Sequence, residues 1–169
     1  MEASKWGVSK IMKILKAQTT DFPAVEEIFR EYQQELNTPV CFQNFEQELA
    51  NLASVYASPT GAIFLALNAN HVIGCVAYCP LKSSENTNEI AELKRLYVHD
   101  DFKGQGIGKA LFQHVMDEAQ KQGYEAIVLE TMDSMKQATS LYLKYGFKSI
   151  GAYSSNPDDD VKYYRYDFH

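Results

Sequence analysis

The chain has little of what marks several large classes of protein. It has only three cysteines in 169 residues and no run of basic residues. In its basic N-terminal stretch, MEASKWGVSKIMKILK, apolar residues occur in runs of at most two, too short for a secretory signal or a membrane span. The formal net charge of -6, without a lysine and arginine stripe, argues against binding duplex nucleic acid. We therefore expect neither a nucleic acid nor a membrane as partner.

The cysteines and histidines have no spacing typical of a metal site. Cys41, Cys75 and Cys79 form no CxxC pair, and an odd count without a secretory signal indicates reduced thiols in a cytoplasmic protein. The four histidines are scattered at His71, His99, His114 and His169. The sequence thus predicts no bound metal.

What is present fits one globular domain of ordinary composition, with 46% hydrophobic and 22% charged residues. Apolar periodicity begins near Met12. We expect residues 12–169 to form a single domain and residues 1–11 to be an N-terminal extension, whether ordered or disordered.

Periodicity and capping residues predict the helices and strands. Apolar residues at helical spacing predict four helices: from Thr20 or Asp21 to Leu36, from Asn44 to Tyr56, from Lys109 to Gly123, and from Ser134 to Tyr145. Apolar or alternating runs predict seven strands: Lys13–Gln18, Ala62–Leu67, Val72–Cys79, Glu89–Val98, Glu125–Thr131, Phe147–Tyr153 and Val161–Phe168. The asparagines between the second and third runs favour a hairpin turn. The order β-α-α-β-β-β-α-β-α-β-β predicts an α/β (α+β) fold, a mixed sheet with helices packed against it.

The stretch HDDFKGQGIGKALF, residues 99–112, places three glycines between a predicted strand and a predicted helix. Such a loop directs backbone N–H groups and the positive end of the helix dipole into one concavity, which suits a phosphate group. Two phosphate motifs fail here. The dinucleotide fingerprint GxGxxG would need glycine at Lys109, and Walker A would need glycine at Lys103 and a hydroxyl at Ala110.

A third pattern, [Q/R]-x-x-G-x-[G/A], fits KGQGIG at Gly106 and Gly108. With ELKRLYV before the loop, GKALF after it and SMKQATSLYLKYGF later in the chain, the sequence resembles the GNAT superfamily of N-acetyltransferases. The resemblance runs from about Met12 to the end. It implies a twisted, mostly antiparallel GNAT-like sheet of about seven strands with about four helices, and acetyl-CoA as co-substrate.

The resemblance also implies where acetyl-CoA binds. The backbones of Leu96, Tyr97 and Val98 would pair with its pantetheine arm. Its pyrophosphate would be held by the loop and the start of the next helix, that is by Lys103, Gly104, Gln105, Gly106, Ile107, Gly108 and Lys109. Two residues depart from the family pattern. Lys103 stands where glutamine or arginine is usual and lacks a bidentate fork, and Met135 replaces an asparagine, which removes one hydrogen bond.

Acetyl transfer needs a neutral amine and a proton for the leaving thiolate. A lysine-like amine is neutral only about once in 10³ to 10⁴ molecules at pH 7, so a base helps. By resemblance, Tyr142 is the acid that protonates the sulfur and also contacts the cofactor. The alternative is an ordinary core tyrosine on an apolar helix face.

By the same resemblance, Glu92 matches an acidic position of the family's corresponding strand, near the acetyl end of the cofactor, which makes it the candidate base. It competes with an ordinary strand carboxylate paired with Lys94. Strand alternation places Glu92, Lys94, Leu96 and Val98 on one face. Other candidates are Glu89, Glu130, His99 and a base acting through water. A main-chain N–H near Leu96 or Tyr97 would stabilise the oxyanion.

The resemblance implies that the acceptor enters opposite the cofactor, beside Tyr32, Phe42, Tyr56 and Tyr153 and the loop Ser154–Asp160. The aromatic residues form either a pocket or part of the core. The run Asp158–Asp160 either attracts an amine or is a solvated turn.

The sequence thus predicts an acetyl-CoA-dependent N-acetyltransferase acting on a primary amine of a small molecule or peptide. The alternative is a non-catalytic acyl-CoA binding or sensing module of the same fold. A third possibility is the same fold with a longer acyl donor. A homodimer is compatible with the resemblance, and no residue specifies one.

Overall fold

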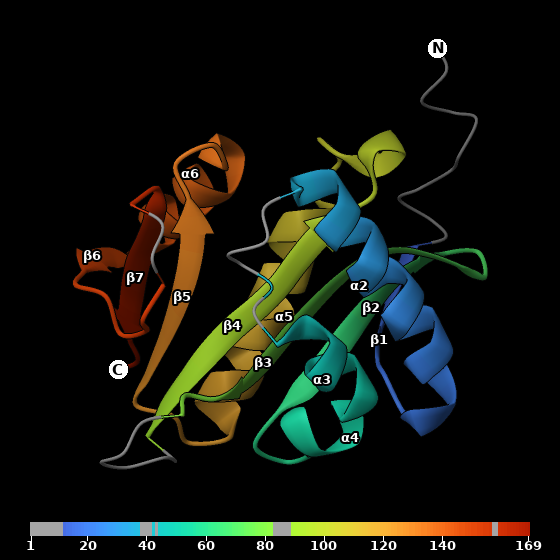
Figure 1. Cartoon of the computed structure of the whole chain (residues 1–169), viewed down its shortest axis with the longest axis horizontal. Helices are drawn as coiled ribbons and strands as arrows, with labels where there is room; N and C mark the ends of the chain where they lie inside the picture. The colour runs from blue at the N-terminus through green and yellow to red at the C-terminus, as the bar shows by residue number, and fades with distance from the viewer. Residues whose placement is uncertain (1–11, 38–41, 43, 83–88, 157–158) are drawn as a thin grey trace.

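The computed structural model describes residues 12–37, 42, 44–82, 89–156 and 159–169. Residues 1–11 therefore lie outside it, as do Cys41 and Asp158, and the division into an extension and one domain stays a prediction. The described strands form one seven-stranded sheet in the order β1-β2-β3-β4-β5-β7-β6 (Figure 1). The strands are β1 (Met12–Lys16), β2 (Ala62–Asn68), β3 (His71–Pro80), β4 (Ile90–Val98), β5 (Ala126–Met132), β6 (Lys148–Ile150) and β7 (Val161–Asp167).

Helices cover both faces of the sheet. Figure 1 shows α2 (Phe22–Leu36), α3 (Phe45–Ala50) and α4 (Leu52–Val55) in front of the sheet and α5 (Ile107–Lys121) behind it. The helix α6 (Lys136–Tyr145) packs in the same hydrophobic cluster as α5. Two short 3-10 turns, Thr19–Asp21 and Asp100–Phe102, precede α2 and follow β4. The predicted mixed, mostly antiparallel α/β fold is therefore confirmed.

Among the strands of the described residues, only β4 and β5 pair in parallel, and their pairing is short. It runs from Ile90 opposite Ala126 to Leu93 opposite Leu129 and goes no further. Beyond that point β4 continues along β3 and β5 continues along β7, so that the two strands diverge (Figure 1). The sheet thus opens in its middle, and the opening leads toward the start of α5.

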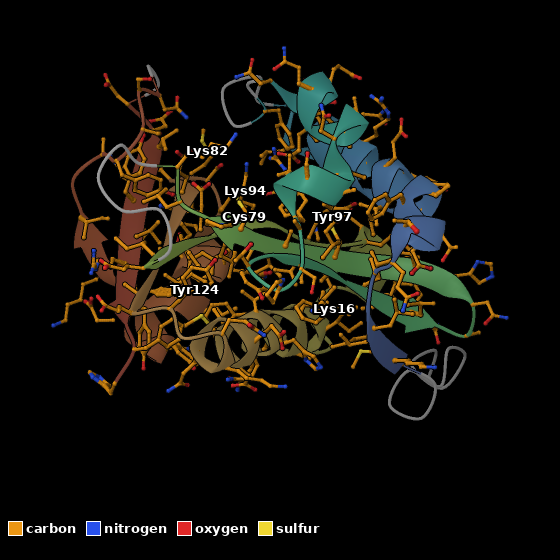
Figure 2. All side chains as sticks on the ribbon, turned by 90° about the horizontal axis from the view of Figure 1, so that it is seen from below. Lys16, Cys79, Lys82, Lys94, Tyr97 and Tyr124 are labelled. Carbon is orange, nitrogen blue, oxygen red and sulfur yellow. The ribbon has the colours of Figure 1, made fainter. Side chains whose placement is uncertain are left out.

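A β-bulge in β4 corrects the predicted alternation of faces. The register against β3 shifts between Cys75 and Ala77, and Arg95 has a φ of 62°, a left-handed value that costs an L-residue about 1–2 kcal/mol. The bulge places Tyr97, like Lys94, on the face covered by α2 to α4, as Figure 2 shows. Leu96 and Val98 pack in the opposite cluster with α5. Strict alternation predicted that Lys94, Leu96 and Val98 share one face. This prediction is wrong, because the bulge separates Lys94 from the other two.

Other predicted elements differ locally. The single helix predicted from Asn44 to Tyr56 is two helices, because the Asn51 side chain donates to the Gln47 carbonyl at 2.8 Å and ends α3 there. The predicted strand Phe147–Tyr153 pairs only as β6. At the hairpin between β2 and β3 the left-handed residue is Ala69, with a φ of 54°, and not an asparagine.

No helix among residues 12–37, 44–82, 89–156 and 159–169 is both long and apolar enough to cross a membrane. Cys75 and Cys79 are buried and unbridged.

Candidate functional site

The candidate site starts at the opening between β4 and β5. Leu96, Tyr97 and Val98, predicted to line the cofactor arm, lie on β4 beyond the last parallel pair. Their strand pairs with β3 on its other side. On the side that faces β5, the backbone of these three residues therefore does not pair with β5. This free side suits an extended ligand with amide groups.

The glycine loop takes a backbone that requires glycine at two of its three positions. Gly104 and Gly106 have φ values of 79° and 82°, and a Cβ at either would meet nothing within 4 Å. Glycine is therefore needed at both for conformation rather than for packing inside the protein. Gly108 has an ordinary backbone, where a Cβ would touch only Val98, at 3.6 Å.

The start of α5 adds further backbone donors beside the glycine loop. Gly106 is the N-cap residue, and the first intrahelical bond is donated by Ala110 to the Gly106 carbonyl at 3.0 Å. The N–H groups of Ile107, Gly108 and Lys109 therefore precede the helical ladder and, with the helix dipole, favour a negative group. The structure thus brings the predicted loop residues together at the end of the opening.

Lys103 is already paired with carboxylates. Its ammonium lies 2.5 Å from Glu35 Oε1 and 2.7 Å from Asp100 Oδ1. Burial lowers the pKa of Lys103, but the two carboxylates outweigh this and raise it, so that the side chain stays charged. Glu35 also accepts a hydrogen bond from the Tyr97 hydroxyl at 2.5 Å. The cation expected to hold a pyrophosphate is thus largely neutralised, which leaves most of that role to the backbone amides.

Tyr142 lies on α6 with its ring 3% exposed. The ring packs against Phe112 and Phe147, with centroids 5.7 Å away in each case. Burial raises the pKa of the phenol, and Tyr32 on α2 adds to the shift. The hydroxyl therefore stays protonated at neutral pH and is available as a donor. Met135, at the N-cap of α6, makes no side-chain capping bond.

Glu92 lies on β4 one residue before the parallel pairing ends, opposite Val128. Its Oε2 accepts a hydrogen bond from the Tyr153 hydroxyl at 2.9 Å. Burial raises the pKa of the carboxyl, against the opposing effects of Lys94 and this hydrogen bond. A carboxylate with a raised pKa at the closed end of the opening has the properties of a base.

The other candidate bases have different surroundings. Glu130, on β5, accepts a hydrogen bond from the Ser154 hydroxyl at 2.5 Å and lies near Glu92, whose pKa it helps to raise. His99 lies 3.1 Å from Glu31 on α2, beside the glycine loop rather than the closed end. Glu89 is exposed and precedes β4.

The residues predicted around the acceptor separate into two groups. Phe42 and Tyr56 are buried in the core between α2 and the sheet. Tyr32 stacks on Tyr97, with ring centroids 5.2 Å apart, and Tyr153 reaches Glu92 from the segment after β6. Of the loop Ser154–Asp160, residues 157 and 158 lie outside the described part.

Two charged residues beside the site were not predicted. Glu48 on α3 pairs with Arg95 at the bulge, at 2.9 Å, and also with Lys94, at 3.2 Å. The contact joins residues 47 positions apart in the chain, and no local pattern signals it.

Two surface hollows of about 400 and 430 Å³ lie away from the opening, along α2 and α4. Of the predicted site residues, only Tyr56 lines either of them. In the described part of the chain no cluster of three or more His, Cys, Asp or Glu side chains suits a metal ion.

Comparison with known proteins identifies the family. Residues 22–147 match the acetyltransferase (GNAT) family. An uncharacterised N-acetyltransferase of Schizosaccharomyces pombe is 34% identical over 146 residues, 86% of this chain and 87% of that protein. The N-acetyltransferase 8F1 of Rattus norvegicus is 36% identical over 104 residues, 62% of this chain but only 47% of that protein. The chain therefore belongs to the GNAT family and is an N-acetyltransferase.

Solved structures share the fold. The structure of yncA from Salmonella typhimurium with its cofactor acetyl-CoA has a TM-score of 0.75 at 19% identity, over 93% of this chain and 94% of that one. An acetyltransferase from Streptococcus agalactiae has a TM-score of 0.76 at 20% identity, over 94% and 99%. Acetyl-CoA is the co-substrate typical of the family.

We expect Gly106→Glu to weaken acetyl-CoA binding by more than about tenfold, a loss of about 1.4 kcal/mol, in a calorimetric titration. The change places a carboxylate at the anion site and forces an L-residue into left-handed backbone. Gly123→Glu is the matched control, because Gly123 also has a positive φ and open space but lies beyond the other end of α5. Equal loss of binding in both variants would contradict an anion site at Gly106.

Proposed function

We propose that this enzyme transfers the acetyl group of acetyl-CoA directly to a primary amine of a small molecule or peptide. The observation that carries the proposal is the sheet opening beyond Leu93 and Leu129. It has a helix N-terminus with a glycine loop at one end and a carboxylate of raised pKa, Glu92, at the other.

The residues present fit the donor substrate. The β4 edge at Leu96 to Val98 offers backbone groups to the pantetheine amides, and the amides of Ile107 to Lys109 suit the pyrophosphate. When bound, acetyl-CoA supplies the thioester carbonyl and a thiol leaving group. Holding an amine against that carbonyl supplies much of the rate by itself, up to about 7–11 kcal/mol.

Three groups of the chain act on protons and charge. Glu92 takes a proton from the acceptor ammonium, directly or through water, and its raised pKa keeps it a competent base near neutral pH. A main-chain N–H near Leu96 or Tyr97 stabilises the oxyanion. The Tyr142 hydroxyl, kept protonated by burial, donates to the departing sulfur.

The alternative, a non-catalytic acyl-CoA sensor, keeps the loop and lacks turnover. Incubation of the wild-type protein with acetyl-CoA and a panel of small and peptide amines distinguishes the two, with thiol release as readout. We expect release that depends on the amine. Saturable acetyl-CoA binding without release by any amine would favour the sensor. Release only from longer acyl-CoA donors would favour a different acyl group.

Tyr142→Phe should lower kcat by about 10²-fold, because general acids contribute about 10²- to 10⁴-fold. The dissociation constant for acetyl-CoA should change little, since the phenyl ring keeps its packing against Phe112 and Phe147. Steady-state kinetics and calorimetry measure both. Tyr145→Phe on the same helix is the control, because Tyr145 packs on the same two rings. Equal kcat values for the wild type and Tyr142→Phe would remove Tyr142 from the mechanism.

Glu92→Gln should abolish the acidic limb of the pH–kcat/KM profile, where the wild type loses activity as pH falls through the raised pKa of Glu92.

The same Glu92→Gln variant should be more stable than the wild type at neutral pH. A carboxyl whose pKa is higher in the folded state destabilises the fold when ionised, so the difference vanishes below the unfolded pKa. Denaturant unfolding at two pH values checks this sign.

Glu130→Gln is the matched control for the pH profile, because Glu130 is the neighbouring carboxylate on β5. An acidic limb that persists in Glu92→Gln but disappears in Glu130→Gln would assign the base to Glu130.

A further inference from the structure

A buried ion pair lies at the bulge of β4. Arg95 Nε is 3.0 Å from Glu48 Oε2, and Arg95 Nη2 is 2.9 Å from Glu48 Oε1, a bidentate geometry. The two side chains are only 6% and 9% exposed. Such a pair contributes little net stability, because desolvation cancels much of the attraction. Its presence at this point of the strand therefore needs another explanation.

The pair is attached to the strained residue of the strand. Arg95 has the left-handed φ of 62° at the register shift, and its carbonyl accepts a hydrogen bond from the Cys75 thiol at 3.2 Å. An L-residue keeps such a backbone only where its surroundings hold it. Glu48 supplies Arg95 with a well-oriented anion.

The surroundings fix the guanidinium and keep the pair charged. The Arg95 guanidinium lies over the ring of Phe42, 4.6 Å from the ring centroid, and 5.2 Å from the centroid of Phe45. Burial alone would raise the pKa of Glu48, but the hydrogen bonds and charge of Arg95, together with Lys94, outweigh it and lower the pKa. The carboxylate is therefore ionised at neutral pH.

We propose that Glu48 is a positioning residue, which acts through Arg95 to hold the β4 bulge and so sets the backbone edge at Leu96 and Tyr97 against the thioester. The proposal rests on the proposed function. Without the bulge, regular alternation would turn Tyr97 away from Tyr32 and Glu35, its present partners. The α3 helix thus controls the geometry of the reacting end without touching either substrate.

The test compares Glu48→Gln, the neutral pair Glu48→Leu/Arg95→Met, and the control Glu46→Gln. Glu46 lies on the same helix and also pairs with an arginine, Arg30, at 2.7 Å, but on α2 and away from β4. We expect Glu48→Gln and the double variant to lose kcat by about 10- to 100-fold, the size of effect that an ångström of misplacement produces. The KM for acetyl-CoA should change much less, and Glu46→Gln should match the wild type.

The double variant keeps the test decisive if Glu48→Gln fails to fold, because replacing a buried ion pair by apolar residues commonly preserves stability. Wild-type kcat in a folded double variant would overturn the proposal. So would a fall in melting temperature in Glu48→Gln with kcat unchanged.

A second readout separates this proposal from the proposed function. Amide hydrogen exchange of the segment 94–98 is measured with and without acetyl-CoA and needs no turnover. We expect acetyl-CoA to protect these amides in the wild type and in Glu46→Gln, and to protect them less in the double variant. Equal protection in all three would overturn the positioning role, whether or not any amine is acetylated.

Discussion

The parallel pairing of β4 with β5 stops after four residue pairs, and the candidate site depends on that interruption. Each strand continues along a different antiparallel neighbour, β3 or β7, so the sheet stays intact on either side while its middle opens. Backbone groups inside a sheet must find partners. At the opening, water or a ligand supplies those partners, and a ligand with amide groups along an extended arm suits this edge. The interrupted pairing thus leaves a main-chain edge in the middle of the sheet.

The bulge at Arg95 sets which side chains face each layer of helices. It lets Lys94 and Tyr97 share the face under α2 and α3, while Leu96 and Val98 pack toward α5. This arrangement places the polar contacts of Lys94 and Tyr97 on the side of β4 covered by α2 to α4 and apolar contacts on the other side. The strain of a left-handed arginine and the burial of a charge pair are both unfavourable by themselves. That they coincide at one residue argues for a functional constraint at that point of the strand.

The sequence predicted the parts of the structure that local rules determine. Apolar periodicity predicted the order of the strands and helices, and the glycines marked the loop between β4 and α5. The positive φ values of Gly104 and Gly106 were not predicted. The second helix splits at Asn51, where side chains hydrogen-bond to the backbone, which periodicity does not report. The Glu48–Arg95 pair at the bulge joins residues that are 47 positions apart in the sequence, and local rules do not report such a contact. Likewise, the sequence indicated that Lys103 could meet an anion, but not that Glu35 and Asp100 already surround it.

The pairing of Lys103 links α2, β4 and the glycine loop. Glu35 on α2 accepts a hydrogen bond from Tyr97 and contacts Lys103, so one carboxylate joins this helix to the strand at the opening and to the loop. Glu31, one turn earlier on α2, contacts His99 between that strand and the loop. A phosphate arriving at the loop must share Lys103 with Glu35 or leave it in place and use the amides alone. In the first case the charge on Glu35 is released and α2 loses part of its attachment. In the second, the loop binds through dipoles that cost no rearrangement, and the network keeps α2 fixed over the opening while the donor is held.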